Sequence, residues 1–184
     1  METRGRTNHL PQLAYNTLPV ALMTQLDSLQ RILKDSHYNL TIFSPEEKEA
    51  LREKVFTKTT RGKHVDCVNC IICDKPIQLK PEEIVRQLYA NRLIEQYSYP
   101  QKRLAFEHPV NFGREKKKAD IIIFDQHRHT DPYIVVELKK PKFKDGKEQL
   151  RSYCNATGAP IGVWTNGVAF CIYRLEASVQ CGLP

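Results

Sequence analysis

The sequence has no apolar run close to the roughly 18 residues that indicate a membrane-spanning helix. Its first residues, Met-Glu-Thr-Arg-Gly-Arg, lack the basic segment followed by an apolar segment that is typical of a signal peptide. These two absences predict a cytoplasmic protein with no membrane partner. Helix-turn-helix and zinc-finger patterns, which read DNA sequence, are also missing, and no internal repeat is present.

Cysteine is limited to six residues, which we expect to be reduced thiols in a cytoplasmic protein. Cys171 lies between apolar neighbours and Cys154 follows a predicted helix face, so both are interpreted as small core residues. Three others have a spacing that could belong to a zinc or cluster site with His64 as fourth ligand: Cys67, Cys70 and Cys73. No second Cys-x-x-Cys pair follows, and the apolar residues between them favour structural thiols.

The composition is that of an ordinary globular protein. The chain has 184 residues, of which 41% are hydrophobic and 27% charged, enough for one domain with a modest core. Its net charge is +7 and its pI is about 9.1. This basic excess suits a polyanion partner, but it is equally consistent with simple solubility.

The beginning of the chain looks like an extension followed by the start of a domain. Residues 1–43 are expected to form an N-terminal extension with a helix over residues 18–33. The next segment, residues 44–47, is typical of a helix start, because Ser44 can cap the helix and Glu47 completes a capping box. Downstream, residues 55–68 are predicted to pair as a hairpin.

The remaining pattern predicts an α/β layered core with a mixed sheet. Apolar spacing indicates a helix over residues 81–97, strands over 104–108, 119–124 and 133–138, a helix over 146–156, and strands over 161–165 and 168–173. Residues 175–184 show no pattern and are treated as a tail. The predicted domain therefore covers residues 44–174.

Two of these predicted strands carry acidic residues at their ends. Asp120 precedes the apolar run 121–123, and Glu137 follows the apolar run 133–136. Residues two apart in a strand point the same way, so Glu137 and Lys139 share a face. If the two strands are neighbours, the carboxylates of Asp120 and Glu137 meet at one edge of the sheet.

Two carboxylates that close repel each other unless a cation lies between them or one is protonated. Mg²⁺ is the natural candidate, with Mn²⁺ as a substitute, because it prefers oxygen ligands and shares them with phosphate. Asp120, Glu137 and the Leu138 carbonyl would hold it for phosphodiester hydrolysis. Lys139 would orient the water or stabilise the transition state, and a role as base stays open. The alternative is an ordinary cross-strand salt bridge.

The helix that follows adds two polar residues to the same region. Gln149 and Tyr153 are four residues apart and therefore lie on one helix face. Their side chains could contact phosphate or steady the metal ligands. An ordinary half-buried helix face is the alternative.

Together these motifs resemble the PD-(D/E)xK nuclease superfamily. More closely, the chain is similar to the N-terminal nuclease domain of type I restriction enzyme R subunits (HsdR), a likeness that extends to segments 81–87 and 117–123. The resemblance covers residues 44–174. It implies a restriction-endonuclease-like core, with a mixed central sheet flanked by helices, after an N-terminal helical extension.

The resemblance implies a Mg²⁺-dependent endodeoxyribonuclease acting on DNA. The residues it assigns to catalysis are Asp120, Glu137, Lys139, Gln149 and Tyr153, with Asp120 and Glu137 as metal ligands. Superfamily members often add an acid from the first core helix, for which Glu83 or Glu82 is the candidate. Acids in a first helical turn also satisfy the helix dipole, which is the alternative.

Basic residues flank the predicted site and would neutralise DNA phosphates without reading bases. They are Lys116, Lys117, Lys118, Lys140 and Lys142. A solvated basic face is the alternative.

R subunits carry an ATP-driven translocase after this domain, but the Gly-x-x-x-x-Gly-Lys-Ser/Thr phosphate loop is missing here. We therefore expect a nuclease without its own ATP motor: a stand-alone domain, a truncated subunit, or a module that works with methyltransferase, specificity and motor subunits. One rival is a non-catalytic DNA-binding or assembly module that retains the nuclease fold. Another is a small metal-binding module centred on the cysteines of segment 67–73.

Overall fold

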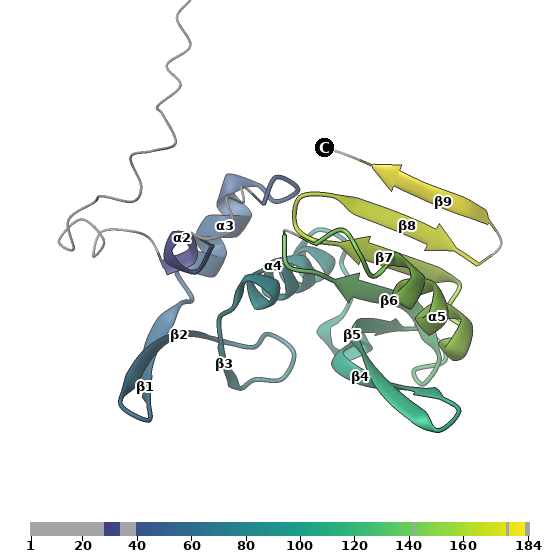
Figure 1. Cartoon of the computed structure of the whole chain (residues 1–184), viewed down its shortest axis with the longest axis horizontal. Helices are drawn as coiled ribbons and strands as arrows, with labels where there is room; N and C mark the ends of the chain where they lie inside the picture. Colours follow the sequence, from purple (N-terminus) through teal and green to yellow (C-terminus); the bar gives the residue numbers. More distant parts are fainter. Residues whose placement is uncertain (1–27, 34–39, 142, 176, 183–184) are drawn as a thin grey trace, which may run out of the picture.

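The computed structural model describes residues 28–33, 40–141, 143–175 and 177–182 (Figure 1). Its helices are α2 (Ser28–Leu33), α3 (Pro45–Arg52), α4 (Pro81–Glu95), the 3-10 helix η3 (Gln101–Arg103) and α5 (Lys147–Thr157). Its strands are β1 (Phe56–Thr60), β2 (Lys63–Asn69), β3 (Pro76–Gln78), β4 (Leu104–Phe112), β5 (Glu115–Phe124), β6 (Pro132–Leu138), β7 (Ile161–Thr165), β8 (Phe170–Arg174) and β9 (Ala177–Gly182).

The central sheet is mixed, with the strand order β4-β5-β6-β7-β8-β9. Neighbouring strands are antiparallel except β6 and β7, which are parallel and are joined through α5. A parallel pair needs such a crossover because a tight turn reverses the chain direction. This topology confirms the predicted α/β fold with a mixed central sheet flanked by helices.

The two faces of the central sheet belong to two hydrophobic clusters, because side chains alternate along each strand. On β5, Ile121 and Ile123 pack in the cluster that contains the buried residues of α4. Ile122 packs in the cluster that contains Leu150 and Tyr153 of α5. Helix α5 lies over β6 and β7 (Figure 1). The helices therefore approach the strand ends of β5 and β6 from both sides.

Close packing of α5 depends on a glycine in β7. A Cβ atom at Gly162 would lie 2.7 Å from Cys154 Sγ and 3.0 Å from Leu150 Cδ1. The missing side chain lets the helix sit directly on the strand. The position of the polar residues of α5 above the sheet follows from this contact.

The small sheet has the order β1-β2-β3 and shares the core of α4. Val68 of β2 and Leu79, just after β3, are buried in the same cluster as the apolar residues of α4. Leu29 and Leu33 of α2 are buried there too. The remainder of the helix predicted over residues 18–33 lies outside the described residues.

Several local predictions are confirmed. The Ser44 hydroxyl accepts a hydrogen bond from the Glu47 N–H at 3.2 Å, and the Glu47 carboxylate accepts one from the Ser44 N–H at 2.7 Å, which is the predicted capping box. The predicted hairpin forms β1 and β2, with Arg61 and Gly62 at positive φ in its turn.

Four strands and one cysteine differ from the sequence-based predictions. Strands β4 and β5 are longer than the predicted 104–108 and 119–124, because β4 continues to Phe112 and β5 begins at Glu115. Residues 177–182, expected to be part of a tail without a pattern, form β9 at the edge of the central sheet. Strand β3 is only three residues long and gave no periodic signal. Cys171 is disulfide-bonded and not a free thiol. Cys154 is free and buried.

The described part of the chain contains no helix that is long and apolar enough to cross a membrane.

Candidate active site

Asp120 and Glu137 lie together at the ends of β5 and β6. The strands are antiparallel neighbours with Ile121 opposite Val136, and the same register sets Asp120 beside Glu137. Both residues are buried, with 9% and 2% of their surface exposed. Asp120 Oδ2 accepts a hydrogen bond from the Leu138 N–H at 2.7 Å, which ties the two strand ends together. The expected convergence of the two carboxylates is therefore present.

The Glu137 carboxylate is only half satisfied. Its Oε1 atom accepts a hydrogen bond from Lys139 Nζ at 2.6 Å, whereas its buried Oε2 atom has no hydrogen-bond partner. Burial raises the pKa of Glu137 to about 7, and the negative charges of Asp120 and Glu82 add to this rise against the opposing effect of Lys139. A buried acceptor of this kind is unfavourable unless something binds it.

Lys139 is positioned by a glycine at the start of α5. A Cβ atom at Gly146 would lie 2.4 Å from Lys139 Cε, so a side chain at this position would displace the end of the lysine from its place beside Glu137. Burial opposes the charge of Lys139, but the hydrogen bond to Glu137 and the nearby carboxylates outweigh it and raise its pKa. Lys139 is thus held as a cation beside Glu137.

Gln149 and Tyr153 connect α5 to this lysine. Gln149 Oε1 lies 3.4 Å from Lys139 Nζ, and Gln149 Nε2 donates to the Tyr153 hydroxyl at 2.8 Å. The Tyr153 hydroxyl in turn donates to the Lys118 carbonyl at 3.0 Å. Tyr153 is 1% exposed, and burial raises its pKa. The two residues form a hydrogen-bonded chain from β5 to Lys139, in which Tyr153 supports and Gln149 faces the site.

Arg86 of α4 is a central residue of the site that the sequence analysis did not identify. Its guanidinium lies 2.6 Å from Asp120 Oδ1, 2.9 Å from Glu83, 2.8 Å from Glu107 and 3.9 Å from Glu82. Its side chain is 11% exposed. Burial opposes its charge, but the surrounding acids raise its pKa. Its spacing of three and four residues from the two helix acids was the available signal.

Glu107 reaches Arg86 from an unusual backbone position. It lies in β4 with φ of 51°, a left-handed conformation that residues other than glycine seldom adopt. The β4–β5 register sets it opposite Asp120. Such local strain persists where the surroundings impose it, and it is frequent at functional sites.

The two acids proposed from the first core helix are in different situations. Both oxygens of Glu83 are occupied, one by Arg86 at 2.9 Å and one by Gln87 Nε2 at 2.9 Å. Glu82 contacts Arg86 only at 3.9 Å. Burial raises the pKa of Glu82, with a further contribution from Asp120. Glu82 is therefore the freer of the two acids.

The predicted basic residues are partly paired. Lys117 lies 3.4 Å from Glu115, and Lys118 lies 3.8 Å from Glu107. Lys116 and Lys140 are exposed. Lys142 lies outside the described residues. The side chains of Lys116, Lys117, Lys118 and Lys140 are exposed to solvent.

The loop that follows β6 is held by hydrogen bonds from Trp164 of β7 and from Asn166 in the turn after β7. Trp164 Nε1 donates to the Asp145 carbonyl at 2.7 Å. The buried Asn166 amide donates to the carbonyls of Pro141 and Phe143, at 2.9 and 3.0 Å. Asn166 lies in the turn between β7 and β8. Its two bonds hold the segment that links Lys139 to α5.

The cysteines of segment 67–73 lie on β2 and the turn after it, and Cys73 is close enough to Glu83 for that carboxylate to contribute to its raised pKa. Cys70 Sγ accepts a hydrogen bond from the Cys73 N–H at 3.2 Å. Cys67 and Cys70 are buried and Cys73 is exposed, and all three are free thiols. Burial raises the pKa of Cys73 to about 11, and contact with Cys70 adds to the rise.

The donor set at the strand ends fits a hard divalent cation. The connected acids are Glu82, Glu83, Glu107, Asp120 and Glu137, and the cations that contact them are Arg86, Lys118 and Lys139. Five carboxylates against three cations leave a surplus of two negative charges. Glu137 Oε2 also lacks a partner. No three His, Cys, Asp or Glu side chains form a ready-made metal cluster in the described ranges, so the site would rely on Asp120, Glu137 and a backbone carbonyl.

The layered fold and the acid pair at the strand ends define a restriction-endonuclease-like α/β domain. A family model described as "Type I restriction enzyme R protein N terminus (HSDR_N)" matches residues 81–181, more than half of the sequence. The chain belongs to this family. The matched region begins with α4 and includes most of β9. Membership supports a nuclease-type function, with DNA and a restriction system as its context.

A solved structure from Anabaena variabilis ATCC 29413, described as a candidate nuclease belonging to DUF820, aligns with a TM-score of 0.42 and 13% identity. The alignment covers 70% of this chain and 76% of that one. No curated protein matches the sequence.

The raised pKa of Glu137 predicts a pH-dependent stability. Glu137 binds its proton more tightly in the folded protein than in the unfolded chain, where a glutamate has a pKa of 4.5. The stabilisation that protonated Glu137 gives to the fold is therefore fully present below pH 4.5 and is lost as pH rises through about 7. In EDTA, wild type should therefore lose about 2 kcal/mol of its free energy of unfolding relative to Glu137→Gln as pH rises from about 5 to about 8. Urea denaturation measures this difference. Glu148→Gln, at an exposed carboxylate, is the control, and parallel curves for all three proteins would contradict the buried charge.

The Arg86 network predicts a large loss of stability for Arg86→Ala. The substitution leaves Asp120 and Glu83 without their shared cation in a mostly buried site, which should lower the free energy of unfolding by about 3 kcal/mol. Arg128→Ala removes an exposed pair with Asp131 and should change it by less than about 1 kcal/mol. Denaturation in EDTA measures both. Equal, small losses would mean that Arg86 does not join α4 to β5.

The contact between Gly146 and Lys139 predicts a specific effect of Gly146→Ala. Gly113→Ala is a matched control, because Gly113 also has positive φ but a Cβ there would meet nothing within 4 Å. Both changes introduce backbone strain, and Gly146→Ala should destabilise by about 1–2 kcal/mol more because it displaces Lys139. In a Lys139→Ala background this excess should disappear. If Gly146→Ala still destabilises more than Gly113→Ala in the Lys139→Ala background, the additional loss does not come from the contact with Lys139.

Proposed function

We propose that the chain is a Mg²⁺-dependent endodeoxyribonuclease domain of the type I restriction R-subunit kind, with Mn²⁺ as a substitute metal. The observation that carries this proposal is the unpartnered Oε2 atom of buried Glu137, beside Asp120 and in contact with Lys139 through its other oxygen. An acid pair with a free oxygen and an adjacent cation is the arrangement that metal-assisted phosphodiester hydrolysis requires. Family membership supports the same reading.

Asp120, Glu137 and the Leu138 carbonyl would hold the metal. When bound, it would activate water and neutralise charge on the phosphate. Lys139 presents its ammonium group next to Glu137, where it stabilises negative charge that develops on a phosphate oxygen. Gln149 fixes the direction of that ammonium group through its 3.4 Å contact. The hydroxyl of Tyr153 holds Gln149 against β5.

Basic residues around the acidic centre would contact the DNA backbone. Lys116, Lys117 and Lys118 lie on β5, which leads directly into Asp120, and Lys140 follows Lys139. These cations attract phosphates without regard to base sequence. The proposed setting is a cytoplasmic restriction system in which methyltransferase, specificity and motor subunits supply sequence recognition and ATP-driven movement.

One observation favours a second candidate, a non-catalytic DNA-binding or assembly module. Both oxygens of Asp120 accept hydrogen bonds, Oδ1 from Arg86 and Oδ2 from the Leu138 N–H. A metal would have to share Asp120 with Arg86 or displace the guanidinium. If Arg86 keeps Asp120 permanently, the acid pair is a structural ion-pair network.

A plasmid assay separates the two candidates. Supercoiled DNA is incubated with the protein in Mg²⁺, in Mn²⁺ or in EDTA, beside Glu137→Ala and Lys139→Ala. Nicking should require the metal and should fall at least about 100-fold in both variants, because each removes a group that acts on the transferring phosphate.

Asp131→Ala and Lys102→Ala are matched controls that remove the same two types of charge from the opposite end of the central sheet. Both should nick like wild type. DNA binding without nicking in either metal would support the non-catalytic module, and nicking that survives Glu137→Ala would exclude the proposed acid pair.

A further inference from the structure

The β1–β2 hairpin has no role in the site described above, and it is exposed over most of its length. All five residues of β1 are exposed, and β2 is exposed at Lys63 and His64 before it enters the core. A hairpin segment that buries nothing is at best marginally stable in water. The exposed part of this hairpin therefore adds little to the stability of the hydrophobic core and is accessible to a binding partner.

The charge of the outer part of this hairpin, residues 57–64, is of one sign. Residues 57–64 contain Lys58, Arg61 and Lys63 together with three threonines and His64, and no acid. Within the described residues none of these three cations has an ion pair. By contrast, Lys117 and Lys118 of the other projecting hairpin, β4–β5, contact glutamates.

The register of β1 and β2 sorts these residues by face. Thr57 lies opposite Asp66 and Thr59 opposite His64, and these pairs contact each other through hydrogen bonds. Lys58 and Lys63 lie on the other face, since residues directly opposite each other share a face and alternate ones face away. With Arg61 in the turn, the cations form one continuous strip.

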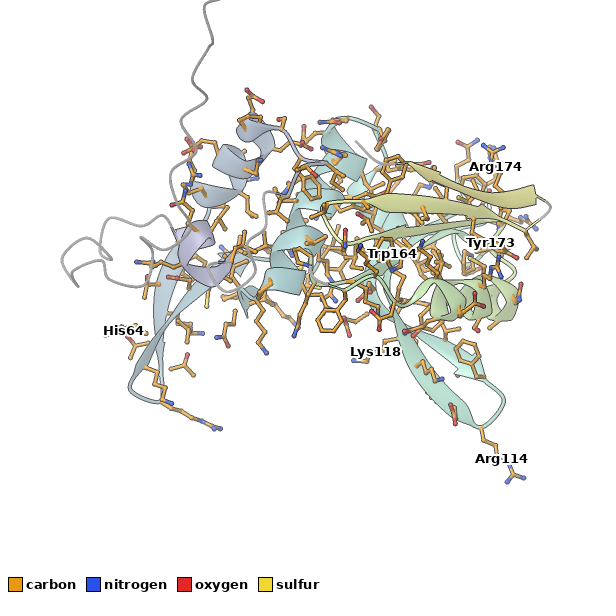
Figure 2. The ribbon with its side chains drawn as sticks, turned by 45° about the horizontal axis from the view of Figure 1, so that its top comes forward. His64, Arg114, Lys118, Trp164, Tyr173 and Arg174 are labelled. Carbon is orange, nitrogen blue, oxygen red and sulfur yellow. The ribbon has the colours of Figure 1, made fainter. Side chains whose placement is uncertain are left out.

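The hairpin projects from the same side of the molecule as the β4–β5 hairpin. Both extend downward from the body of the protein in the two views (Figure 1). Figure 2 shows His64 on the first hairpin, Arg114 at the tip of the second, and Lys118 between them. Lys118 is two residues before Asp120 in β5, so the acidic centre lies at the base of the β4–β5 hairpin.

We infer that the β1–β2 hairpin is a second DNA-binding arm, which contacts the phosphates of a duplex held across the site and the β4–β5 hairpin. The inference rests on the proposed function. Cations and hydroxyl groups suit phosphate oxygens. Residues 57–64 contain no Phe, Tyr or Trp on which an unpaired base could stack, and the exposed Phe56 lies at the base of the hairpin, opposite Cys67, so the arm suits a duplex better than a single strand.

The test compares Lys58→Ala/Arg61→Ala/Lys63→Ala with wild type in binding to a short fluorescent duplex. EDTA is present, so no cleavage occurs. Three lost phosphate contacts should weaken binding at least about tenfold at about 0.1 M salt. They should also reduce the slope of log affinity against log salt by about two to three, because each contact contributes about 0.9.

The matched control is Lys102→Ala/Arg128→Ala/Arg174→Ala, which removes three exposed cations from the opposite end of the central sheet. Its affinity and salt slope should equal those of wild type. If both triple variants weaken binding equally, the loss follows from net charge, and the proposed DNA-binding role of the β1–β2 hairpin is refuted. A single strand that competes as well as the duplex would also overturn it.

A second measurement uses the unaltered chain, so it does not depend on folding of a variant. Amine labelling with and without duplex should show protection of Lys58 and Lys63 but not of Lys102. Unprotected Lys58 and Lys63 would refute the arm while metal-dependent nicking still supported the nuclease. Protection and binding without nicking would retain the arm and refute the nuclease. Absence of duplex binding would refute both.

Discussion

Glu137 is buried at the end of β6 with one oxygen bound to Lys139 and the other without a partner. A buried carboxylate is stable only if nearby groups offset its charge, or if it takes a proton. Its pKa of about 7 shows that the protein alone offsets the charge incompletely. The neighbouring strands and helices surround this incompletely offset negative charge, and a divalent cation would neutralise it.

One pair of strands and two helices meet at this carboxylate, each with a different task. Strands β5 and β6 bring Asp120 and Glu137 together, and the Asp120 bond to the Leu138 N–H locks their relative position. Helix α4 contributes Arg86, which balances the acids on one side. Helix α5 approaches from the other side and leaves space for Lys139 at Gly146. The family match, which runs from α4 into β9, spans all three.

The sequence predicted the parts of the site that depend on local periodicity. Alternation along β6 predicted that Glu137 and Lys139 share a face, and helical spacing predicted that Gln149 and Tyr153 share a helix face, where they form a hydrogen bond. The capping box at Ser44 and the hairpin turn at Arg61 were equally local. In each case, residues within a few positions of one another determine the geometry.

Features that depend on tertiary packing were not predictable in this way. Arg86 and Asp120 are far apart in sequence, and only the docking of α4 beside β5 makes them neighbours. The left-handed backbone of Glu107 has no sequence signal. Strand β9 is defined by pairing with β8, and the disulfide at Cys171 likewise needs a partner that local pattern does not name.

The most direct test of the account is a crystal structure of the protein soaked in Mn²⁺, with the metal located by its anomalous scattering. The account predicts a peak about 2.1 Å from Glu137 Oε2 and from an Asp120 oxygen, with the Arg86 guanidinium shifted or sharing Asp120. An empty site at saturating Mn²⁺, with Asp120 still bound only by Arg86 and Leu138, would contradict it.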